Sequence, residues 1–140
     1  MSNASNGAAF EREMCELLAS HGFWTHRIAP NRAGQQPADI IAVKCNYHTL
    51  IDCKVISTRA GLPFSRIEDN QLLAMERFDA RAIHQPWFAL RMPSGAVMML
   101  SYSKVRNLMD EGKTGLTNNE LLDDYHYTMS IDNWLARFGK

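Results

Sequence analysis

The chain has 140 residues, 46% of them hydrophobic, which is enough for one domain with a packed core. Basic and acidic residues number 15 each, so the net charge gives no global argument for a nucleic-acid partner. No apolar run approaches the ~20 residues of a membrane span, and no leader sequence opens the chain, so we expect a cytoplasmic protein without a membrane partner. The three cysteines contain no C-x-x-C pair, which argues against a disulfide framework or a cysteine zinc site.

The charges are distributed unevenly along the chain. Residues 21–66 hold six basic residues and only two acidic ones, Asp39 and Asp52, a net charge of +4. Polyanion binding needs such a local basic segment and does not need a high overall pI. A chance fluctuation of surface charge is the alternative, and the charge pattern alone does not separate the two.

In chain order, residues 1–6 are expected to be disordered or left over from cloning, and residues 7–140 to form a single domain. The spacing of apolar residues predicts a helix over 8–20, with Phe10, Met14 and His21 on its apolar face, ending before Gly22. Strands are predicted over 23–28, 38–44 and 49–56, the first two separated by a polar stretch that contains glycine and proline.

A second long helix is predicted from Ser65 to about residue 82, because Ser65 and Glu68 have the spacing of a capping box. A hairpin over 86–92 and 96–101, a helix over 103–110, an edge strand over 125–130 and a helix over 131–138 follow. The leading order is α-β-β-β-α-β-β, so we predict an α/β fold with a mixed central sheet flanked by helices.

The third predicted strand carries the strongest chemical signal. Side chains alternate between the faces of a strand, so Ile51, Cys53 and Val55 share an apolar face while Asp52 and Lys54 lie together on the other. A charged pair in the middle of a short strand is costly unless it is exposed or in use. The alternative is an ordinary ion pair on a solvated sheet surface.

Asp39 begins the second strand, thirteen positions before Asp52. If the two strands form a tight hairpin, the start of one lies near the end of the other, and the two carboxylates converge. Two carboxylates at one point suit Mg²⁺, a hard ion that takes oxygen ligands. Lys54 beside them could orient an attacking water or stabilise a charged phosphate. Taken alone, Asp39 could equally be an ordinary turn residue.

Each helix contributes one further candidate. At 100° per residue, Glu11 lies at the edge of the apolar face of the first helix, while Glu16 points to solvent. Glu11 is therefore the best candidate for a third carboxylate, although a glutamate near a helix N-terminus also favours the helix dipole. Gln71 is a polar residue on the otherwise apolar face of the second helix, so it needs a hydrogen-bond partner, either within the core, at the active centre or on a DNA phosphate.

Asp39 followed by Asp52-Cys53-Lys54 resembles the PD-(D/E)XK signature of restriction-type and Holliday-junction nucleases. Residues 7–13 and 21–23 are similar to the opening of archaeal Holliday-junction resolvases, and residues 39–78 are similar to the bacterial RecU resolvases. The chain departs from the pattern in three ways. One residue separates Pro37 from Asp39, an aspartate stands at 52 where glutamate is commoner, and Asp39 follows Ile28 too closely for the RecU stalk.

The resemblance implies a restriction-endonuclease-like core that cuts DNA with Mg²⁺, for which Mn²⁺ can substitute, and that works as a homodimer in DNA recombination or repair. The implied metal ligands are Asp39, Asp52, the Cys53 carbonyl and Glu11. Lys54 and Gln71 complete the implied catalytic set, and no small-molecule cofactor is expected. The candidates for DNA phosphate contacts are Arg27, Arg32, Arg59 and Arg66. Three alternatives are a nuclease for flaps, ends or damaged DNA, an inactive DNA-binding module of the same fold, and a protein-interaction domain.

Overall fold

The protein was studied as a computed structural model, which describes residues 3–29, 36, 38–123 and 126–140. The helices are α1 (Asn3–Ser20), α2 (Asp69–Arg81), α3 (Tyr102–Asp110), α4 (Asn118–Leu122) and α5 (Ile131–Phe138), with a 3₁₀ turn η1 (Phe64–Arg66). The strands are β1 (Trp24–Arg27), β2 (Ile40–Lys44), β3 (Tyr47–Val55), β4 (Leu62–Pro63), β5 (Trp87–Arg91), β6 (Val97–Ser101), β7 (Gly115–Leu116) and β8 (Met129–Ser130).

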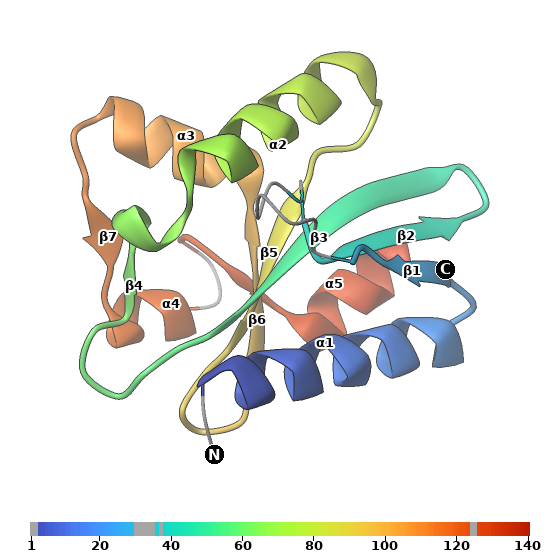
Figure 1. The fold of residues 1–140 in the computed structure, drawn as a ribbon, viewed down its shortest axis with the longest axis horizontal. Coiled ribbons are helices and arrows are strands. Elements are labelled where there is room, and N and C mark those ends of the chain that lie inside the picture. The colour runs from blue at the N-terminus through green and yellow to red at the C-terminus, as the bar shows by residue number, and fades with distance from the viewer. Residues whose placement is uncertain (1–2, 30–35, 37, 124–125) are drawn as a thin grey trace.

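Six strands form one mixed sheet in the order β1-β2-β3-β5-β6-β8. The central neighbours β3 and β5 run parallel, because α2 crosses over between them, and the other neighbouring strands are antiparallel. The short strands β4 and β7 pair separately. Figure 1 shows α1 and α5 on one side of the sheet and α2 and α3 on the other.

Strand alternation divides the buried apolar residues between the two faces of the sheet. Phe88 and Leu90 of β5 pack into the cluster beneath α2 and α3, while Trp87 and Ala89 pack into the cluster beneath α1 and α5. Ile51 of β3 belongs to the second cluster, where Cys53 also packs. The predicted apolar face of the third strand is therefore confirmed, and the opposite face is the one that carries Asp52.

The predicted α/β architecture and the order of its leading elements are confirmed, with several corrections at the boundaries. Helix α1 begins at Asn3, so residues 3–6 are helical instead of lying outside the fold. Its His21 is exposed and does not lie on the apolar face. Helix α2 begins after Glu68, because the capping box joins Glu68 to Gln71 and not Ser65 to Glu68. The sequence did not indicate β4, β7 or α4.

The C-terminal segment is part of the same packed structure. The predicted final helix is confirmed as α5, and its Trp134 is fully buried against the sheet. Strand β8 pairs with the edge of β6 over two residues, and residue 125 of the predicted edge strand lies outside the described residues. None of the helices in the described ranges is long and apolar enough to cross a membrane.

Candidate active site

The hairpin of β2 and β3 brings Asp39 beside Asp52, as its predicted geometry requires. The Asp39 N–H donates to the carbonyl of Ile51 (3.1 Å), which extends the β2–β3 pairing by one residue. Asp39 therefore lies opposite Asp52 on the sheet face that α2 covers. Both side chains are buried, with 7% of Asp39 and 1% of Asp52 exposed to solvent. The sheet thus holds two carboxylates together in its interior.

Lys54 lies on the same face, two residues beyond Asp52. Its Nζ is 2.9 Å from Asp52 Oδ2, and only 11% of the lysine side chain is exposed. Within the described part of the chain, Asp52 Oδ2 accepts no hydrogen bond of favourable direction despite this short contact. This oxygen therefore keeps a lone pair available for a further ligand.

Gln71 of α2 reaches down to the same carboxylate. Its Nε2 donates to Asp52 Oδ1 (3.0 Å), and its Oε1 accepts from the N–H of Glu68 (3.3 Å) in the capping box that starts α2. This buried glutamine therefore has a hydrogen-bond partner in one of the two candidate carboxylates. The side chain links the first turn of α2 to the orientation of Asp52.

Burial and the neighbouring carboxylate both raise the pKa of Asp39. Burial, which disfavours the charged form, and the neighbouring Asp52 raise this pKa to about 8, while the hydrogen bond from the Cys53 N–H opposes the shift. More distant Glu11 contributes in the same direction as Asp52. A cation bound between the carboxylates would remove this penalty, because it stabilises both charged forms.

Glu11 lies nearer to this site than the other glutamates of α1 without joining the carboxylate pair. Its side chain is 21% exposed against 54% for Glu13, and its Oε1 is 3.3 Å from the guanidinium of Arg27. No group of three or more acidic, histidine or cysteine side chains arranged to hold a metal occurs in the described ranges. The pair formed by Asp39 and Asp52 is therefore the candidate metal-binding core, and Glu11 stands beside it.

The backbone of Cys53 also faces the carboxylates. Its N–H donates to Asp39 Oδ2 (2.8 Å), although its side chain packs toward α1 on the other face. The N–H and C=O of one strand residue point to the same edge, so the Cys53 carbonyl points toward the side of Asp39 as well. Two carboxylates and one carbonyl form an oxygen donor set of the kind that Mg²⁺ accepts, with waters completing its coordination.

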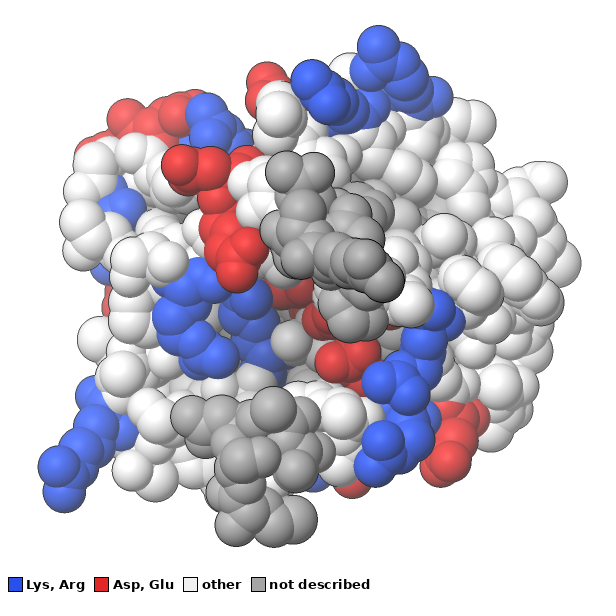
Figure 2. Space-filling model, in the orientation of Figure 1, with Lys and Arg blue, Asp and Glu red and all other residues white. Residues whose placement is uncertain are grey.

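A groove runs away from Lys54 along the end of β3. It has a volume of about 520 Å³ and is lined by Lys54, Arg66 and the start of α1 at Asn6 and Gly7, among others. The Arg66 guanidinium donates to the carbonyl of Val55 (3.0 Å), which holds it at this edge. Figure 2 shows acidic side chains recessed near the middle of this face with basic side chains on both sides. A phosphate could approach along such an edge.

The remaining predicted phosphate contacts are not gathered at one point. Arg27 lies on the α1 side of the sheet in its ion pair with Glu11. Arg59 is exposed in the segment between β3 and β4. Arg32 lies outside the described residues. Of the three arginines that the structure describes, Arg66 is the one that lines the groove beside Lys54.

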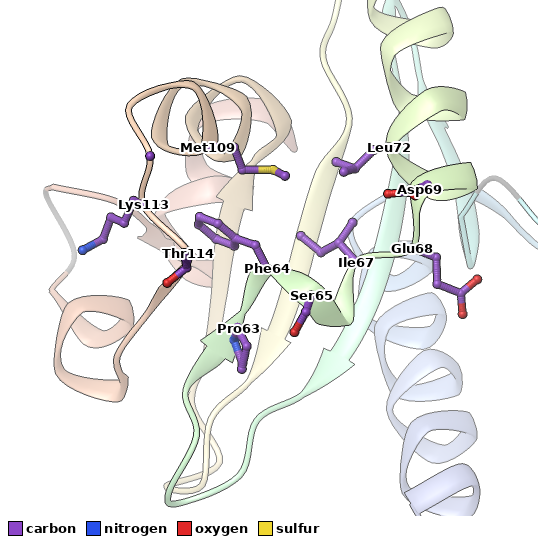
Figure 3. Close-up of a pocket in the computed structure, with 11 residues that line it drawn as sticks. Pro63, Phe64, Ser65, Ile67, Glu68, Asp69, Leu72, Met109, Lys113 and Thr114 are labelled. Carbon is purple, nitrogen blue, oxygen red and sulfur yellow. The ribbon is translucent and has the colours of Figure 1, made fainter.

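A larger cavity than this groove lies elsewhere. It has a volume of about 880 Å³ and opens between η1 and the segment that follows α3 (Figure 3). Phe64, Ile67 and Met109 form its apolar lining, and Glu68 and Asp69 stand on its rim. Lys113 also lines it, so the cavity carries charges of both signs on a largely apolar lining and lacks the basic surface that a DNA backbone requires.

Gln36 is a site residue that the sequence analysis missed. Its Nε2 donates to Asp39 Oδ1 (2.7 Å), which parallels the bond from Gln71 to Asp52 Oδ1. Each aspartate is thus held by one glutamine amide. The only signal in the sequence was a glutamine three residues before Asp39, in a polar segment that has no periodicity to indicate its direction.

Known protein families and solved structures include proteins similar to this chain. The family described as archaeal Holliday junction resolvase (Hjc) matches residues 2–118. The crystal structure of Hjc from Archaeoglobus fulgidus, a Holliday junction resolvase from a hyperthermophile, has a similar fold, with a TM-score of 0.57 and 20% sequence identity. The match covers 70% of this chain and 78% of that one. A search of curated proteins gave no match. Because the family match spans most of the sequence, the chain belongs to the archaeal Holliday junction resolvase (Hjc) family.

Proposed function

We propose that this chain hydrolyses phosphodiester bonds of branched DNA as an Mg²⁺-dependent endonuclease, with Asp39, Asp52 and Lys54 at its catalytic centre. Membership of the resolvase family makes it a nuclease of DNA recombination. The observation that carries the proposed mechanism is the buried pair of carboxylates with Lys54 Nζ 2.9 Å from Asp52 Oδ2. Burying charged side chains destabilises the fold, and these side chains add no apolar packing in return. Their burial therefore favours a functional role.

Asp39 and Asp52 would hold the metal ion together with the Cys53 carbonyl, and Glu11 would act through a bound water. When bound, the ion would supply Lewis-acid stabilisation of the phosphate and a more acidic water. The donor set is made of oxygens, which suits Mg²⁺, and Mn²⁺ accepts the same ligand type. The lone pair left open on Asp52 Oδ2 supports this assignment.

Lys54 would act on the reacting phosphate. In hydrolysis a water oxygen bonds to phosphorus and one ester P–O bond breaks. The proton that the water loses balances the negative charge on the ester oxygen that leaves. The Lys54 ammonium lines the groove beside the carboxylates, where it can orient the water or stabilise the negative charge of the transition state. Its contact with Asp52 fixes the direction in which the ammonium points.

Gln36 and Gln71 are positioning residues in this scheme. They donate to Oδ1 of Asp39 and Asp52 respectively, which leaves the Oδ2 atoms beside the Cys53 N–H and the Lys54 ammonium. Arg66 would contact a phosphate along the groove, and Arg27 and Arg59 would make weaker contacts farther out. Arg32, outside the described residues, stays a candidate from the sequence. Phosphate contacts of this kind position the DNA without reading its sequence.

We infer that the active form is a homodimer. A four-way junction offers two equivalent strands to cut, and one chain carries one carboxylate pair. Two-fold symmetry is the commonest way to present two equivalent sites. Sedimentation with and without junction DNA checks this inference, and a monomer that cuts both strands in one binding event would contradict it.

The proposed function is tested by cleavage assays with four DNA substrates: a four-way junction, a flap, a linear duplex and a single strand. The wild-type protein should cut the junction with Mg²⁺ or Mn²⁺ and lose this activity with a chelator. The Lys54→Ala variant should bind the junction and cut it on the order of 10²–10³-fold more slowly. Binding of all substrates without any cleavage would identify an inactive DNA-binding module, and faster cutting of flaps would identify a different preferred structure.

A further inference from the structure

Trp24 stands apart from the other two tryptophans of the chain. Its side chain is 60% exposed, whereas Trp87 is 7% and Trp134 0% exposed. Its ring lies parallel to that of His26, with an angle of 6° between the planes and 6.0 Å between the centroids. The two residues are separated by one position on β1, so they share one face of the strand. This strand is the edge of the sheet.

The sheet register shows which face this is. Trp24 lies opposite Val43, and His26 lies opposite Ile41, which in turn lies opposite Leu50. Leu50 and Asp52 share a face of β3, because they also are separated by one position. The aromatic pair therefore lies on the same face of the sheet as the two catalytic carboxylates.

The intervening residues of β1 point the other way. Thr25 lies opposite Ala42, and Arg27 lies opposite Ile40, and both partners belong to the cluster beneath α1 and α5. Arg27 accordingly pairs with Glu11 of α1. The two faces of β1 thus differ: one supports the core, and the other presents two exposed aromatic rings.

The same strand leads directly to the active centre. The N–H of Ile28 donates to the carbonyl of Asp39 (2.8 Å), so the end of β1 marks the level of the carboxylates. At about 3.3 Å per residue, His26 lies ~7 Å and Trp24 ~13 Å from this level. Stacked nucleotides rise about 3.4 Å each, so the rings lie roughly two to four nucleotides from a phosphate at the carboxylates.

The chemistry of this part of the sheet suits a nucleobase. Each of the two rings begins a row of side chains that continues across β2 and β3. The row of Trp24 contains Val43 and His48, and the row of His26 contains Ile41 and Leu50. None of these six side chains is acidic. Helix α2 covers the β3 end of the first row, where Phe78 contacts His48 with 6.2 Å between ring centroids. Exposed aromatic faces bind bases by stacking, and a base inside a duplex is already stacked on its neighbours.

We propose that Trp24 and His26 form a stacking site for an unpaired nucleobase of the DNA strand that is cut. The inference rests on the proposed nuclease function and adds a preference, among branched substrates, for those with unpaired nucleotides within about two to four positions of the cut. The site holds the strand by its base, so it acts without any particular base sequence.

The binding experiment needs no catalysis. A 12-nucleotide oligothymidine and a 12-base-pair duplex are titrated without metal into the wild-type protein and into Trp24→Ala, Trp24→Phe and Ile83→Ala. The ratio of single-strand to duplex affinity should fall about tenfold in Trp24→Ala and recover largely in Trp24→Phe. Ile83 is 88% exposed after the end of α2, and its variant should keep the wild-type ratio.

Tryptophan fluorescence reports the contact directly, because Trp24 is the exposed one of the three tryptophans. The oligothymidine should protect the wild-type fluorescence from acrylamide quenching, and Trp24→Phe should show little quenching with or without it. An unchanged affinity ratio in Trp24→Ala, or no protection by the oligothymidine, would overturn the proposal. Protection that rises with protein concentration without DNA would also overturn it, by identifying a second copy of the chain as the occupant.

Cleavage separates this proposal from the proposed function. Two branched substrates are compared that differ only in whether three nucleotides beside the cut are paired. The wild-type protein should prefer the unpaired form, and Trp24→Ala should reduce this preference to near one. If the wild-type protein cuts neither substrate with Mg²⁺, the nuclease mechanism fails, while the titrations still decide whether the stacking site exists.

Discussion

Strands β3 and β5 lie side by side and parallel at the centre of the sheet, yet on the face beneath α2 one carries charged side chains and the other apolar ones. β5 places Phe88 and Leu90 there, both fully buried in the apolar cluster with α2 and α3. β3 places Asp52 opposite Phe88 and Lys54 opposite Leu90. Neighbouring positions of one sheet therefore carry either apolar packing or a buried charged cluster.

The difference shows where this fold gains and loses stability. Apolar burial on β5 stabilises the native state, whereas burying carboxylates destabilises it unless a partner compensates. Lys54 compensates Asp52, but Asp39 shares its site with a like charge, and burial together with that charge raises its pKa to about 8. Substitutions on β3 should accordingly lower the cleavage rate, whereas substitutions on β5 should lower the free energy of unfolding.

The largest expected effect is on cleavage. Asp52→Asn removes a proposed metal ligand while keeping the size of the side chain, so cleavage of branched DNA should fall on the order of 10³-fold. The variant should still unfold in one cooperative transition, because Asp52 adds no apolar packing to either cluster. Single-turnover cleavage and urea unfolding measure the two quantities on the same sample. Near-normal cleavage by a folded Asp52→Asn protein would remove Asp52 from the mechanism.

The matched change on β5 should do the reverse. Leu90→Ala leaves a cavity in the cluster beneath α2 and should lower the free energy of unfolding by about 3 kcal/mol. Its cleavage rate at a temperature where it stays folded should remain within a few-fold of the wild-type rate, since the Leu90 side chain has no group that could bind a metal or a phosphate. A loss of cleavage comparable to that of Asp52→Asn, in folded protein, would show that the two strands are not separable in function.

The third effect is the pH dependence of stability, which comes from Asp39. Its folded-state pKa is raised to about 8 from the ordinary value of 3.8, so the native state binds more protons than the unfolded state between these values. Stability from this group is therefore complete below about pH 4 and is lost as the pH rises through about 8. An amide side chain stays neutral at every pH, so Asp39→Asn should be several kcal/mol more stable than the wild type at pH 9 with a chelator and almost equal to it at pH 4.

Metal ions provide the control for this prediction. Mg²⁺ binding needs the ionised carboxylate, so the stabilisation that Mg²⁺ gives to the wild-type protein should grow as the pH rises toward 8. Asp39→Asn should show little of this stabilisation at any pH. Thermal unfolding with and without Mg²⁺ from pH 5 to pH 9 measures both effects. A wild-type stability that increases with pH in the chelator would contradict the assignment of the shift to Asp39.

Periodicity was sufficient to predict the parts of this site that lie on regular elements. Alternation on β3 put Asp52 and Lys54 on one face, and the hairpin spacing brought Asp39 beside them. The inward direction of Gln71 followed from the helical repeat of α2, and its contact with Asp52 is observed. These inferences held because a strand or helix fixes the direction of each side chain once its register is known.

Contacts between distant or irregular segments could not be predicted in this way. The start of α2 was misplaced because Ser65 and Glu68 match the capping-box pattern, whereas the observed box joins Gln71 to Glu68, a residue type that does not belong to the pattern. The N–H of Phe64 donates to the carbonyl of Thr114, fifty positions away, and residues 64–66 form η1 instead of the first turn of α2. The pairing of Glu11 with Arg27 and the bond from Gln36 to Asp39 likewise depend on where a loop or neighbouring element lies.

The smallest expected effect distinguishes the two roles of Gln71, which caps α2 through Oε1 and holds Asp52 through Nε2. Gln71→Glu keeps an oxygen for the capping box but replaces the donor to Asp52 with a negative charge. We expect cleavage to fall about tenfold in Gln71→Glu, and its free energy of unfolding to fall as well in a chelator at neutral pH, because a third carboxylate is buried beside Asp52. Gln71→Leu should lose both the cleavage and about 1 kcal/mol of stability. Full cleavage activity in folded Gln71→Glu protein would show that Gln71 serves only as a helix cap. Among the described residues, Lys54 would then be the one side chain that directly supports Asp52.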